Sequence, residues 1–396
     1  MTDGKAGKVL FAATVDAHIT AFHLPYLKWF RDNGYETYVA ANGDAQIPYC
    51  DRKIRIDMRR NPFRPENLRA RRQLAALLRQ HHFALIHCHT PVGGALTRLA
   101  ARKYRRSGTI VLYTAHGFHF MKGGSASGRL LYYPIEKFLS RFTDGLIAVN
   151  AEDYETARDR LRAKRTFLSR GVGYDGARFF PPGRGDKIRY RKVCGYAGDE
   201  VLLICVAELN RNKNQRFLMD ALKRVRQDRE AFVARERARN TSAGAGDSRL
   251  PDVRLLLVGG DGMKGAYQTY ARKIGVAAQV DFLGRRDDVD KLLPMCDIAV
   301  CSSLREGLPV NVMEAMACGL PVVATDIRGH RDLIEDGRTG FLAPVGDVGA
   351  FASKIRPLIE DPSGRSRAGN AAALAIRPYA IDKALDAMIG IYKSFL

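Results

Sequence analysis

Short apolar runs alternate with amphipathic segments along the first half of the chain. Five runs predict strands, over residues 8–14, 37–41, 85–89, 109–114 and 146–150. The segments beside them show helical spacing of apolar residues, near 20–33, 66–80, 92–105, 127–141 and 151–163. The strand runs are apolar on both faces, as is typical of parallel strands that helices cover on both sides. The first half therefore predicts an α/β domain built from βαβ units.

The same alternation returns in the second half of the chain. Predicted strands cover 201–209, 253–260, 279–284, 297–303 and 321–325, and predicted helices lie near 213–235, 263–274, 286–294 and 309–318. Between the two series, residues 171–186 are rich in Gly and Pro and have no period, which indicates a linker. Residues 235–251 are charged at first and then rich in small residues, which predicts an exposed loop.

The two series are long enough to form two separate hydrophobic cores. A chain of 396 residues with 46% hydrophobic content exceeds one ordinary domain. We expect a first Rossmann-like domain over 1–185 and a second over 186–379. The last segment, 380–396, has apolar residues at helical spacing, and we expect it to pack back onto the first domain.

The apolar runs are too short for a membrane span, which needs 18 or more uncharged residues, and the N-terminus turns acidic at Asp16, unlike a signal peptide. The seven cysteines are scattered, mostly within apolar runs, and they form no C-x-x-C pair. We interpret them as buried thiols in a reducing compartment. The sequence therefore predicts a cytoplasmic protein.

Positive charge is concentrated in the first domain. The chain carries a net charge of +22, and residues 1–185 hold 31 Lys and Arg against 15 Asp and Glu, a net of +16. The densest part consists of Arg52, Lys53, Arg55, Arg59, Arg60, Arg64, Arg69, Arg71, Arg72 and Arg79. Such a surface suits an anionic membrane, a diphosphate-bearing acceptor or nucleic acid, or else it is plain surface decoration. The sequence has no helix-turn-helix, zinc-finger or RNP-like pattern, so nucleic acid is not expected.

The most informative stretch for chemistry is SSLREGLPVNVMEAMACGLPVVATDIRGHRDLIEDGRTGFLAP, residues 302–344. Here a loop leads from a predicted strand into a predicted helix, with Glu306 before the helix and Glu314 inside it. A helix N-terminus offers free backbone N–H groups and a positive dipole end to a diphosphate, and Gly307 lets the backbone approach closely. One carboxylate then reaches a sugar and the other a ribose. Without this context, the two glutamates would be a cap and a surface residue.

This stretch resembles the donor-site signature of family 4 glycosyltransferases, and the resemblance extends over nearly the whole chain. Its most specific part is REGLPVNVMEAMACGLPVVATDIRGHRDLIEDGRTGFL. In the first half, HCHTPVGGALTRLAAR, TAHGFHF and YYPIEKFLSRFTDGLIAVN are similar to the bacterial branch that assembles capsular and other exported polysaccharides on a lipid carrier. The resemblance implies an α/β protein of the GT-B fold, with two Rossmann-like domains facing a central cleft. It also implies a retaining transferase with a nucleotide-sugar donor, for which we expect a UDP-sugar.

On the donor side, the resemblance places Glu306 beside the reacting carbon of the sugar and assigns the ribose hydroxyls to Glu314. The sugar and diphosphate are expected to lie along a run that binds mostly through backbone groups: Gly307, Leu308, Pro309, Val310 and Asn311. Gly284 and Arg285 match the region that holds the nucleotide base.

The phosphate clamp of the family falls in VAELNRNKNQ, where Lys213 matches its lysine. Glu208 stands where many members have Arg, and Ala207 replaces their Gly. We therefore interpret Arg211 as the second positive charge, because a diphosphate leaving group needs about two cationic or helix-end partners. No D-x-D motif is placed at the end of a predicted strand, and we expect neither a metal ion nor a cofactor.

On the acceptor side, His116 follows an apolar strand, so we expect it at the carboxyl edge of the first sheet, where open α/β folds bind ligands. The resemblance makes His116 a hydrogen-bond partner of the donor sugar; the alternative is a histidine satisfied within its own loop. His119 is a further candidate on this side. Asp16 and His18 follow the first strand, where many members have two glycines, and we interpret Asp16 as orienting an acceptor hydroxyl.

These residues suggest a mechanism in which domain closure brings His116 and Asp16 to the donor and excludes water. The bond to the diphosphate then breaks through an oxocarbenium-like state while the clamp stabilises the departing charge. We expect the acceptor to be a saccharide on a polyprenyl diphosphate and the protein to attach peripherally to the inner face of the cell membrane. Two alternatives remain: a non-hydrolysing UDP-sugar epimerase of the same architecture, and a non-catalytic partner that binds polysaccharide or membrane.

Overall fold

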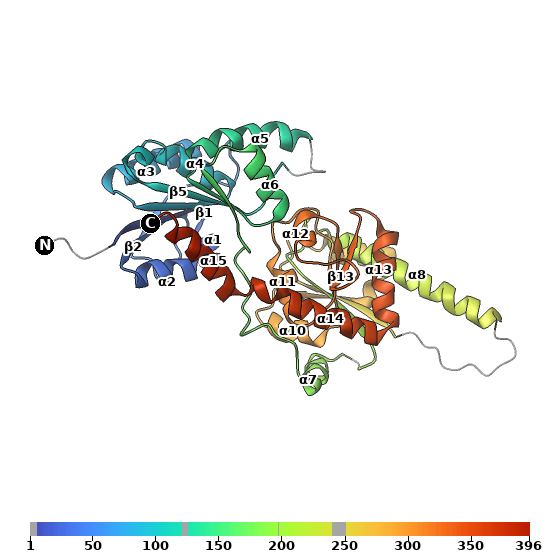
Figure 1. The fold of residues 1–396 in the computed structure, drawn as a ribbon. Helices are drawn as coiled ribbons and strands as arrows, with labels where there is room; N and C mark the ends of the chain where they lie inside the picture. The colour runs from blue at the N-terminus through green and yellow to red at the C-terminus, as the bar shows by residue number, and fades with distance from the viewer. Residues whose placement is uncertain (1–5, 121–125, 197, 240–250) are drawn as a thin grey trace. The chain divides into compact units, whose positions relative to one another are not determined.

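The computed structural model describes residues 6–120, 126–196, 198–239 and 251–396. The chain divides into two compact units, each built on its own sheet (Figure 1). The first unit holds residues 1–173 together with 382–396, and the second holds 174–381. The chain therefore passes between the two units twice.

The first unit is built on a seven-stranded parallel sheet in the order β3-β2-β1-β4-β5-β6-β7. Its strands are β1 Gly7–Val15, β2 Tyr35–Asn42, β3 Arg52–Arg55, β4 Leu85–His89, β5 Ile110–Ala115, β6 Gly145–Ala148 and β7 Arg165–Leu168. Side chains of β1 alternate between two cores, with Leu10 in one and Phe11 in the other, and both are fully buried. The strand is apolar throughout because each face of the sheet is covered.

Helices cover both faces of this sheet (Figure 1). On one face lie α3 Glu66–Gln80, α4 Pro91–Ala101, α5 Ala126–Leu139 and α6 Ala151–Arg160, and on the other lie α1 Asp16–Phe22, α2 Leu24–Asp32 and α15 Ile381–Lys393. Short 3-10 turns follow at Tyr104–Ser107 and Ser140–Phe142. Met388 and Ile391 of α15 enter the core of the first unit, and the Tyr392 hydroxyl hydrogen-bonds Nδ1 of His87 at 2.8 Å.

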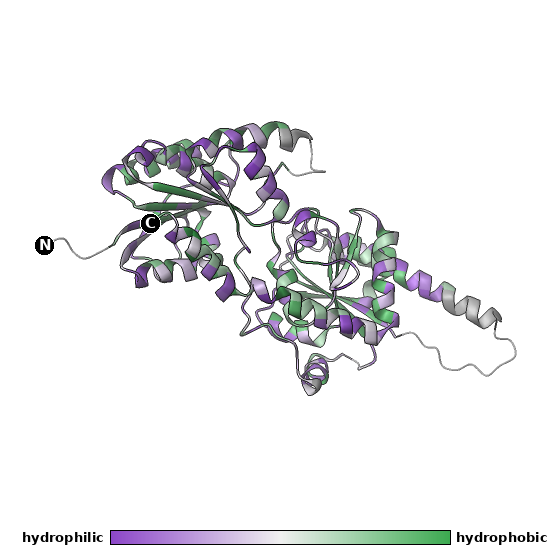
Figure 2. Ribbon diagram, viewed as in Figure 1, coloured by the Kyte–Doolittle hydropathy of each residue, from purple (hydrophilic) through white to green (hydrophobic). Residues whose placement is uncertain are grey.

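The second unit is built on a six-stranded parallel sheet in the order β10-β9-β8-β11-β12-β13. Its strands are β8 Val201–Val206, β9 Val253–Val258, β10 Val280–Gly284, β11 Ile298–Cys301, β12 Val322–Thr325 and β13 Gly340–Ala343. One face is covered by α8 Gln215–Arg239, α9 Ala266–Ile274 and α13 Val348–Glu360, and the other by α10 Val289–Met295, α11 Val310–Ala317 and α14 Pro362–Ile376. The remaining elements are α7 Arg184–Cys194, α12 Arg328–Arg331 and 3-10 turns at Ala277–Gln279 and Arg377–Tyr379. In both units, hydrophobic residues gather along the strands (Figure 2).

Both sheets reverse their strand order once, between β1 and β4 in the first and between β8 and β11 in the second. At such a switch point the chain leaves two neighbouring strands toward opposite faces, and a crevice remains at the carboxyl edge, where open α/β folds bind ligands. The loops that follow these four strands are therefore the places where sites are expected.

The sequence prediction found the central strands but missed three: β3, β7 and β13. All three are four residues long and lie at a sheet edge, and none of them is buried along its whole length. The predicted exposed loop over 235–251 is wrong at its start, because residues 235–239 continue α8. Its centre, 240–250, lies outside the described residues.

The division between the units comes inside the predicted linker. The prediction set it at 185/186, whereas the structure divides between 173 and 174. Tyr174 donates its N–H to the Tyr379 carbonyl at 3.1 Å and accepts the Ile381 N–H at 2.8 Å, and Phe179 enters the core of the second sheet. Residues after 173 therefore pack with the second unit.

Two global expectations concern membrane spans and cysteines. Among the residues that the structure describes, no helix is both long enough and apolar enough to cross a bilayer. All seven cysteines are free, and five are buried. The prediction of buried thiols is wrong for Cys194, which ends α7 on the surface, and Cys50 is half-buried.

Candidate functional site

The loops after β8 and β11 meet at the switch point of the second sheet. The Asn212 side chain donates to the Arg305 carbonyl at 3.0 Å, and its backbone carbonyl accepts the Leu304 N–H at 2.8 Å. The Ser302 hydroxyl donates to the Lys213 carbonyl at 2.8 Å. These bonds hold the two loops in a fixed register, so side chains from both can act on one ligand.

Lys213 and Glu306 form an ion pair across these loops. Lys213 Nζ lies 2.7 Å from Glu306 Oε1, and the two side chains are only 23% and 14% exposed. Burial acts to lower the pKa of Lys213, but the attraction of Glu306 and their hydrogen bond raise it overall. The lysine therefore keeps its charge, as binding of an anion requires. The structure thus brings together the residues predicted to hold the diphosphate and the sugar.

Helix α11 begins just after this ion pair in the chain. The predicted donor-binding run occupies the loop and the first turn, half-buried apart from the buried proline: Gly307, Leu308, Pro309, Val310 and Asn311. The first N–H groups of a helix have no partner within it, and this end carries partial positive charge. The Asn311 side chain donates to the Val206 carbonyl at 2.8 Å, which ties α11 to the end of β8. The donor-binding run predicted from the sequence therefore lies at a helix N-terminus, and its role toward a ligand stays a prediction.

Glu314 lies one turn further along α11 and is half-buried. Burial raises its pKa to about 7, with Asp175 adding to the rise and Arg178 opposing it. A carboxyl group accepts at both oxygens when ionised and donates from one when protonated. The hydrogen bonds that Glu314 is able to make therefore change near neutral pH.

Three other predicted donor residues lie on loops at the carboxyl ends of strands. Arg211 is exposed in the loop after β8. Gly284 ends β10 with φ of 65°, a conformation that favours glycine. The Arg285 side chain is 86% exposed, with its nearest carboxylate, that of Asp287, at 4.0 Å. Unlike Lys213, neither arginine belongs to the Glu306 ion pair.

The glycine turn after β9 supports the loop after β8. Gly259 has φ of 153°, and a Cβ there would lie 2.1 Å from the Ala207 carbonyl oxygen, so only glycine allows this approach. Its N–H donates to the Gly284 carbonyl at 2.8 Å. Glu208, which departs from the family pattern, is exposed and accepts the Asn210 amide at 3.2 Å. The VGGDG turn therefore has a structural role beside the site.

Arg328 positions Glu306, although its role was not predicted from the sequence. This arginine is 1% exposed, and its Nε donates to the Glu306 carbonyl at 3.1 Å. A Cβ on the following Gly329 would lie 2.6 Å from the Gly307 carbonyl oxygen, so the two backbones are in close contact. Buried arginines are uncommon, and sequence reasoning places arginine on the surface by default. Gly329, directly after Arg328, is consistent with this close backbone contact, because glycine has no side chain.

In the first unit, Asp16 begins α1 and makes contacts to the loop after β2. Its Oδ2 accepts the Ala45 N–H at 2.9 Å and forms an ion pair with Lys53 at 2.7 Å. Burial acts to raise the pKa of Asp16, but the bonds from Lys53 and Ala45 lower it overall. Gly43 is so close that a Cβ would lie 2.2 Å from Oδ2. Asp16 therefore joins α1 to this loop, and its role toward an acceptor stays a prediction.

His18 and His116 meet at the switch point of the first sheet, with their Nε2 atoms 3.3 Å apart. Burial lowers the pKa of His18 to about 4, with Arg60 contributing, and burial also lowers the pKa of His116 well below its usual range. Both imidazoles are therefore neutral near pH 7. His119 lies three residues on, with its ring centroid 5.0 Å from that of Tyr132.

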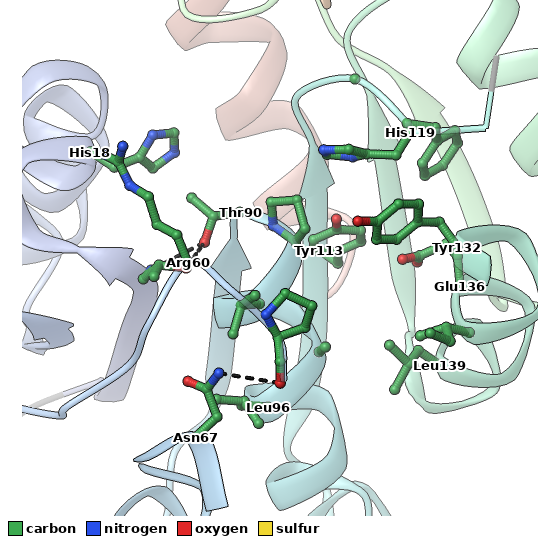
Figure 3. Close-up of a pocket in the computed structure, with 18 of the residues that line it drawn as sticks. His18, Arg60, Asn67, Thr90, Leu96, Tyr113, His119, Tyr132, Glu136 and Leu139 are labelled. Carbon is green, nitrogen blue, oxygen red and sulfur yellow. Dashed lines mark hydrogen bonds between the residues drawn. The ribbon is translucent and has the colours of Figure 1, made fainter. Parts of the chain in front are cut away.

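A cavity of about 790 Å³ opens in the first unit beside these histidines. Figure 3 shows His18 and Arg60 on one side of it and Tyr132, Glu136 and Leu139 of α5 on the other. Its apolar lining includes Val15, Phe22, Phe63, Val92, Leu96, Phe118, Leu131 and Ile135. Mostly apolar walls with a few polar groups are typical of a binding site for a largely apolar ligand.

Exposed apolar side chains lie on two of the segments that line this cavity, and we call them its apolar rim. Leu130 is 79% exposed, Leu131 40% and Ile135 46% on α5, and Phe63 in the loop before α3 is 76% exposed. Single exposed apolar residues are common, but several on one helix beside an apolar cavity indicate a surface that meets an apolar partner.

A buried ion pair underlies the cavity wall. The guanidinium of Arg98 is fully buried and binds both carboxylate oxygens of Glu136, at 2.5 and 3.1 Å. It also lies 3.8 Å from the ring centroid of Tyr113. Burial acts to lower the pKa of Arg98, but Glu136 raises it overall. This pair joins α4 to α5 and was not predicted from the sequence.

Comparison with known proteins gives matches along the whole chain. The model described as Glycosyltransferase Family 4 matches residues 26–173, and that described as Glycosyl transferases group 1 matches residues 186–374. A protein named as a glycosyltransferase, EpsD of Bacillus subtilis (strain 168), is 43% identical over 390 residues, which are 98% of this chain and 97% of EpsD. The UDP-Gal:alpha-D-GlcNAc-diphosphoundecaprenol alpha-1,3-galactosyltransferase of Escherichia coli is 26% identical over 324 residues, 81% of this chain and 77% of that enzyme.

Solved structures show the same architecture. HepE of Anabaena, in complex with UDP and glucose, is 20% identical, with a TM-score of 0.74, covering 98% of this chain and 100% of that one. The two parallel-sheet Rossmann-like units are those of the GT-B class, as predicted. The family match makes the protein a transferase, which sets aside the epimerase and the non-catalytic partner. With near-full coverage by a 43% identical relative and two family models in succession, this chain belongs to family 4 of the glycosyltransferases.

Proposed function

We propose that this enzyme transfers a sugar, with retention of anomeric configuration, from a UDP-sugar to a saccharide carried on a polyprenyl diphosphate. The observation that carries the proposal is the Lys213–Glu306 ion pair at the switch point of the second sheet, beside the N-terminus of α11. Two similar proteins support it. One uses UDP-Gal and a diphosphoundecaprenol-linked acceptor, and the other was solved with UDP and glucose.

In the proposed donor complex, Lys213 and the first turn of α11 bind the diphosphate, and Glu306 contacts the sugar. Lys213 and Glu306 now form an ion pair, and in the complex Lys213 would turn from Glu306 to the diphosphate. Glu314 binds the ribose hydroxyls, and Arg211 supplies the second positive charge. Gly284 and Arg285 contact the uracil base of the donor.

The reaction then requires that the negative charge on the departing UDP be stabilised. The bond between the anomeric carbon and the diphosphate oxygen breaks, and its electron pair leaves with UDP. Lys213 and the helix end stabilise that charge, so the mechanism uses neither a metal ion nor a cofactor at the donor. The acceptor oxygen bonds to the same face of the carbon, and its proton passes to the departing phosphate. His116 hydrogen-bonds the donor sugar, and Asp16 orients the acceptor hydroxyl.

For the acceptor, the cavity of the first unit offers the matching chemistry. Its apolar walls suit the isoprenoid chain, and Arg60 and His18 at one side suit the diphosphate and the saccharide. His119 lines the same cavity from the loop after β5. The exposed leucines of α5 and the arginine-rich surface of the first unit are suited to an anionic membrane, where such an acceptor is anchored. We therefore propose peripheral attachment to the inner face of the cell membrane, in the assembly of a cell-surface polysaccharide.

The proposal is tested by donor and acceptor screening. UDP- and GDP-sugars are incubated with purified enzyme and a polyprenyl-diphosphate-linked saccharide, and the product anomer is read by NMR. We expect transfer from a UDP-sugar with an unchanged anomeric configuration. Glu306→Gln should abolish it, while Glu155→Gln, an exposed glutamate of α6, should not. An inverted product, or full transfer by Glu306→Gln, contradicts the proposal.

A further inference from the structure

Four histidines from separate segments converge at the switch point of the first sheet. His18 lies on α1, His23 between α1 and α2, His89 at the end of β4 and His116 after β5. Each offers one ring nitrogen, and these four atoms all lie within 4.8 Å of one another. Nε2 of His18 and Nε2 of His116 are 3.3 Å apart, and the rings of His23 and His89 stack with centroids 3.8 Å apart.

Two of these rings have no hydrogen-bond partner in the described part of the chain. Both nitrogens of His23 and both of His89 are buried, and the side chains are 2% and 0% exposed. A neutral imidazole carries one N–H donor and one lone pair, and each buried group left unpaired costs about 1–3 kcal/mol. Two adjacent buried rings without partners therefore reduce the stability of the fold, which is unusual for a protein core.

The neighbouring His87 shows how this fold satisfies an ordinary buried histidine. Its ring lies 4.1 Å from that of His89 and is also fully buried. Yet its Nδ1 bonds the Tyr392 hydroxyl and its Nε2 bonds the Thr114 hydroxyl, both at 2.8 Å. The absence of partners is thus particular to His23 and His89, because Nε2 of His18 and Nε2 of His116 are within hydrogen-bond distance of each other.

We propose that His18, His23, His89 and His116 bind one first-row divalent metal ion, with Zn²⁺ as the simplest case. Imidazole suits zinc, copper, iron and nickel, and a tetrahedral zinc site has Zn–N distances of about 2.0–2.1 Å. Nitrogens at the corners of such a tetrahedron are about 3.3 Å apart, which matches the His18–His116 separation. Because the four nitrogens all lie within 4.8 Å of one another, any pair needs to close by at most about 1.5 Å to reach this geometry.

The protonation state agrees with this geometry. Burial lowers the pKa of each of the four rings, that of His18 to about 4 and those of His23, His89 and His116 well below their usual range. Each ring is therefore neutral at neutral pH and keeps one unprotonated nitrogen, which is the form that binds a metal.

A metal here would join the two sides of the switch point. It would tie α1 and the turn before α2 to the ends of β4 and β5, and so hold the wall of the cavity in place. His18 belongs to both the cluster and the cavity lining, so the ion would add positive charge beside Arg60. Coordination through Nε2 would leave Nδ1 of His116 for the sugar. The inference stands apart from the donor chemistry proposed for the second unit.

The test measures metal content in the full chain, purified without a histidine tag. The protein is stripped with a chelator, incubated with Zn²⁺ alone, passed through a desalting column and analysed by mass spectrometry of the metal. We expect about one Zn²⁺ per chain. His18→Gln and His116→Gln, whose side chains are only half-buried, should each lower retention at least tenfold. His82→Gln, an exposed histidine of the same unit, should retain the wild-type amount.

Co²⁺ in place of Zn²⁺ separates a cluster site from scattered surface binding. A tetrahedral nitrogen site gives visible absorption bands that octahedral, hydrated Co²⁺ lacks, and we expect them in the wild type and in His82→Gln only. Circular dichroism confirms that each variant is folded. If folded wild-type protein retains no Zn²⁺, or if folded His18→Gln and His116→Gln both retain it fully, the metal site is refuted, whatever the enzyme's transfer activity.

Discussion

The two units share one strand order around their switch points but place different chemistry there. In the second unit, a charged pair, Lys213 and Glu306, lies beside the positive end of a helix. In the first unit, neutral histidines border a largely apolar cavity. A charged site at a helix N-terminus suits a diphosphate leaving group, whereas an apolar cavity suits a lipid carrier. The fold therefore sets where a ligand binds, and the loop side chains decide which ligand it is.

The two units also differ in how firmly one ion pair in each is held: Arg98–Glu136 in the first unit and Lys213–Glu306 in the second. Arg98 binds Glu136 through two bonds and is fully buried, so its charge is committed within the fold. Lys213 meets Glu306 through one bond and stays 23% exposed, so it is able to exchange its partner for a ligand. A committed pair should affect stability when broken, and an exchangeable pair should affect catalysis.

Breaking the committed pair gives the largest expected effect. Arg98→Met leaves the carboxylate of Glu136 without its partner in a buried position, and it should destabilise the first unit by about 3–5 kcal/mol. Chemical denaturation measures the change. The double variant Arg98→Met with Glu136→Leu should recover most of the loss, because no buried charge remains. A single variant as stable as the wild type would show that the pair is not committed.

Breaking the exchangeable pair should leave stability nearly unchanged and reduce transfer. Lys213→Met removes the charge that stabilises the departing diphosphate, so kcat/KM should fall about 10²–10³-fold. Arg211→Met should cost about tenfold or less, because this side chain is exposed and lies outside the Glu306 pair. Steady-state kinetics compare the two variants. A larger loss for Arg211→Met would reverse their assigned roles.

Glu314 should give the second unit a dependence of stability on pH. Its pKa is about 7 in the folded state against 4.5 ordinarily, so the folded state holds the proton more tightly and stability falls as pH rises from about 4.5 to 7. Glu314→Gln removes this loss and should be more stable than the wild type at pH 8, by up to about 3 kcal/mol, with no difference near pH 4. Thermal unfolding at both pH values, beside the exposed control Glu335→Gln, measures it. If Glu314→Gln differs from the wild type in stability by the same amount at both pH values, the raised pKa of Glu314 is not the cause.

The smallest expected effect concerns the membrane. Leu130 is 79% exposed on α5, and Leu130→Ser should weaken binding to anionic vesicles about fivefold, a loss of about 1 kcal/mol of apolar burial. Ile188→Ser, an equally apolar residue that is 70% exposed on α7 of the second unit, is the matched control. Vesicle sedimentation at low and high salt gives both numbers, and salt should weaken binding. If the two variants behave alike, the apolar rim has no membrane role.

The sequence singled out neighbouring residues more readily in the second unit than in the first. Glu306 and Glu314 belong to one short loop and helix, and Lys213 belongs to a loop that follows a predictable strand, so local pattern pointed to residues that the structure brings together. The partners of Asp16 and Arg98 come from other elements, and only tertiary packing pairs them with Lys53 and Glu136.

The histidine cluster shows the same limit. His18 and His116 were singled out individually, but no spacing rule joins them to His23 and His89, because the four residues converge only when β1, β4 and β5 pair. No spacing motif in the sequence therefore predicted a metal site in the first unit. Likewise, the edge strands β3 and β7 lack the apolar runs that identified their neighbours, and β13 has only four residues.

The division of labour between the units is tested most directly by calorimetric titration with UDP. The wild type and Ile135→Asp, which places a charge in the cavity of the first unit, should bind UDP equally, although Ile135→Asp should transfer poorly to the lipid-linked acceptor. Lys213→Met should bind UDP at least about tenfold more weakly. Unchanged binding by Lys213→Met, or loss of UDP binding in Ile135→Asp, would contradict the assignment of the donor to the second unit and the acceptor to the first.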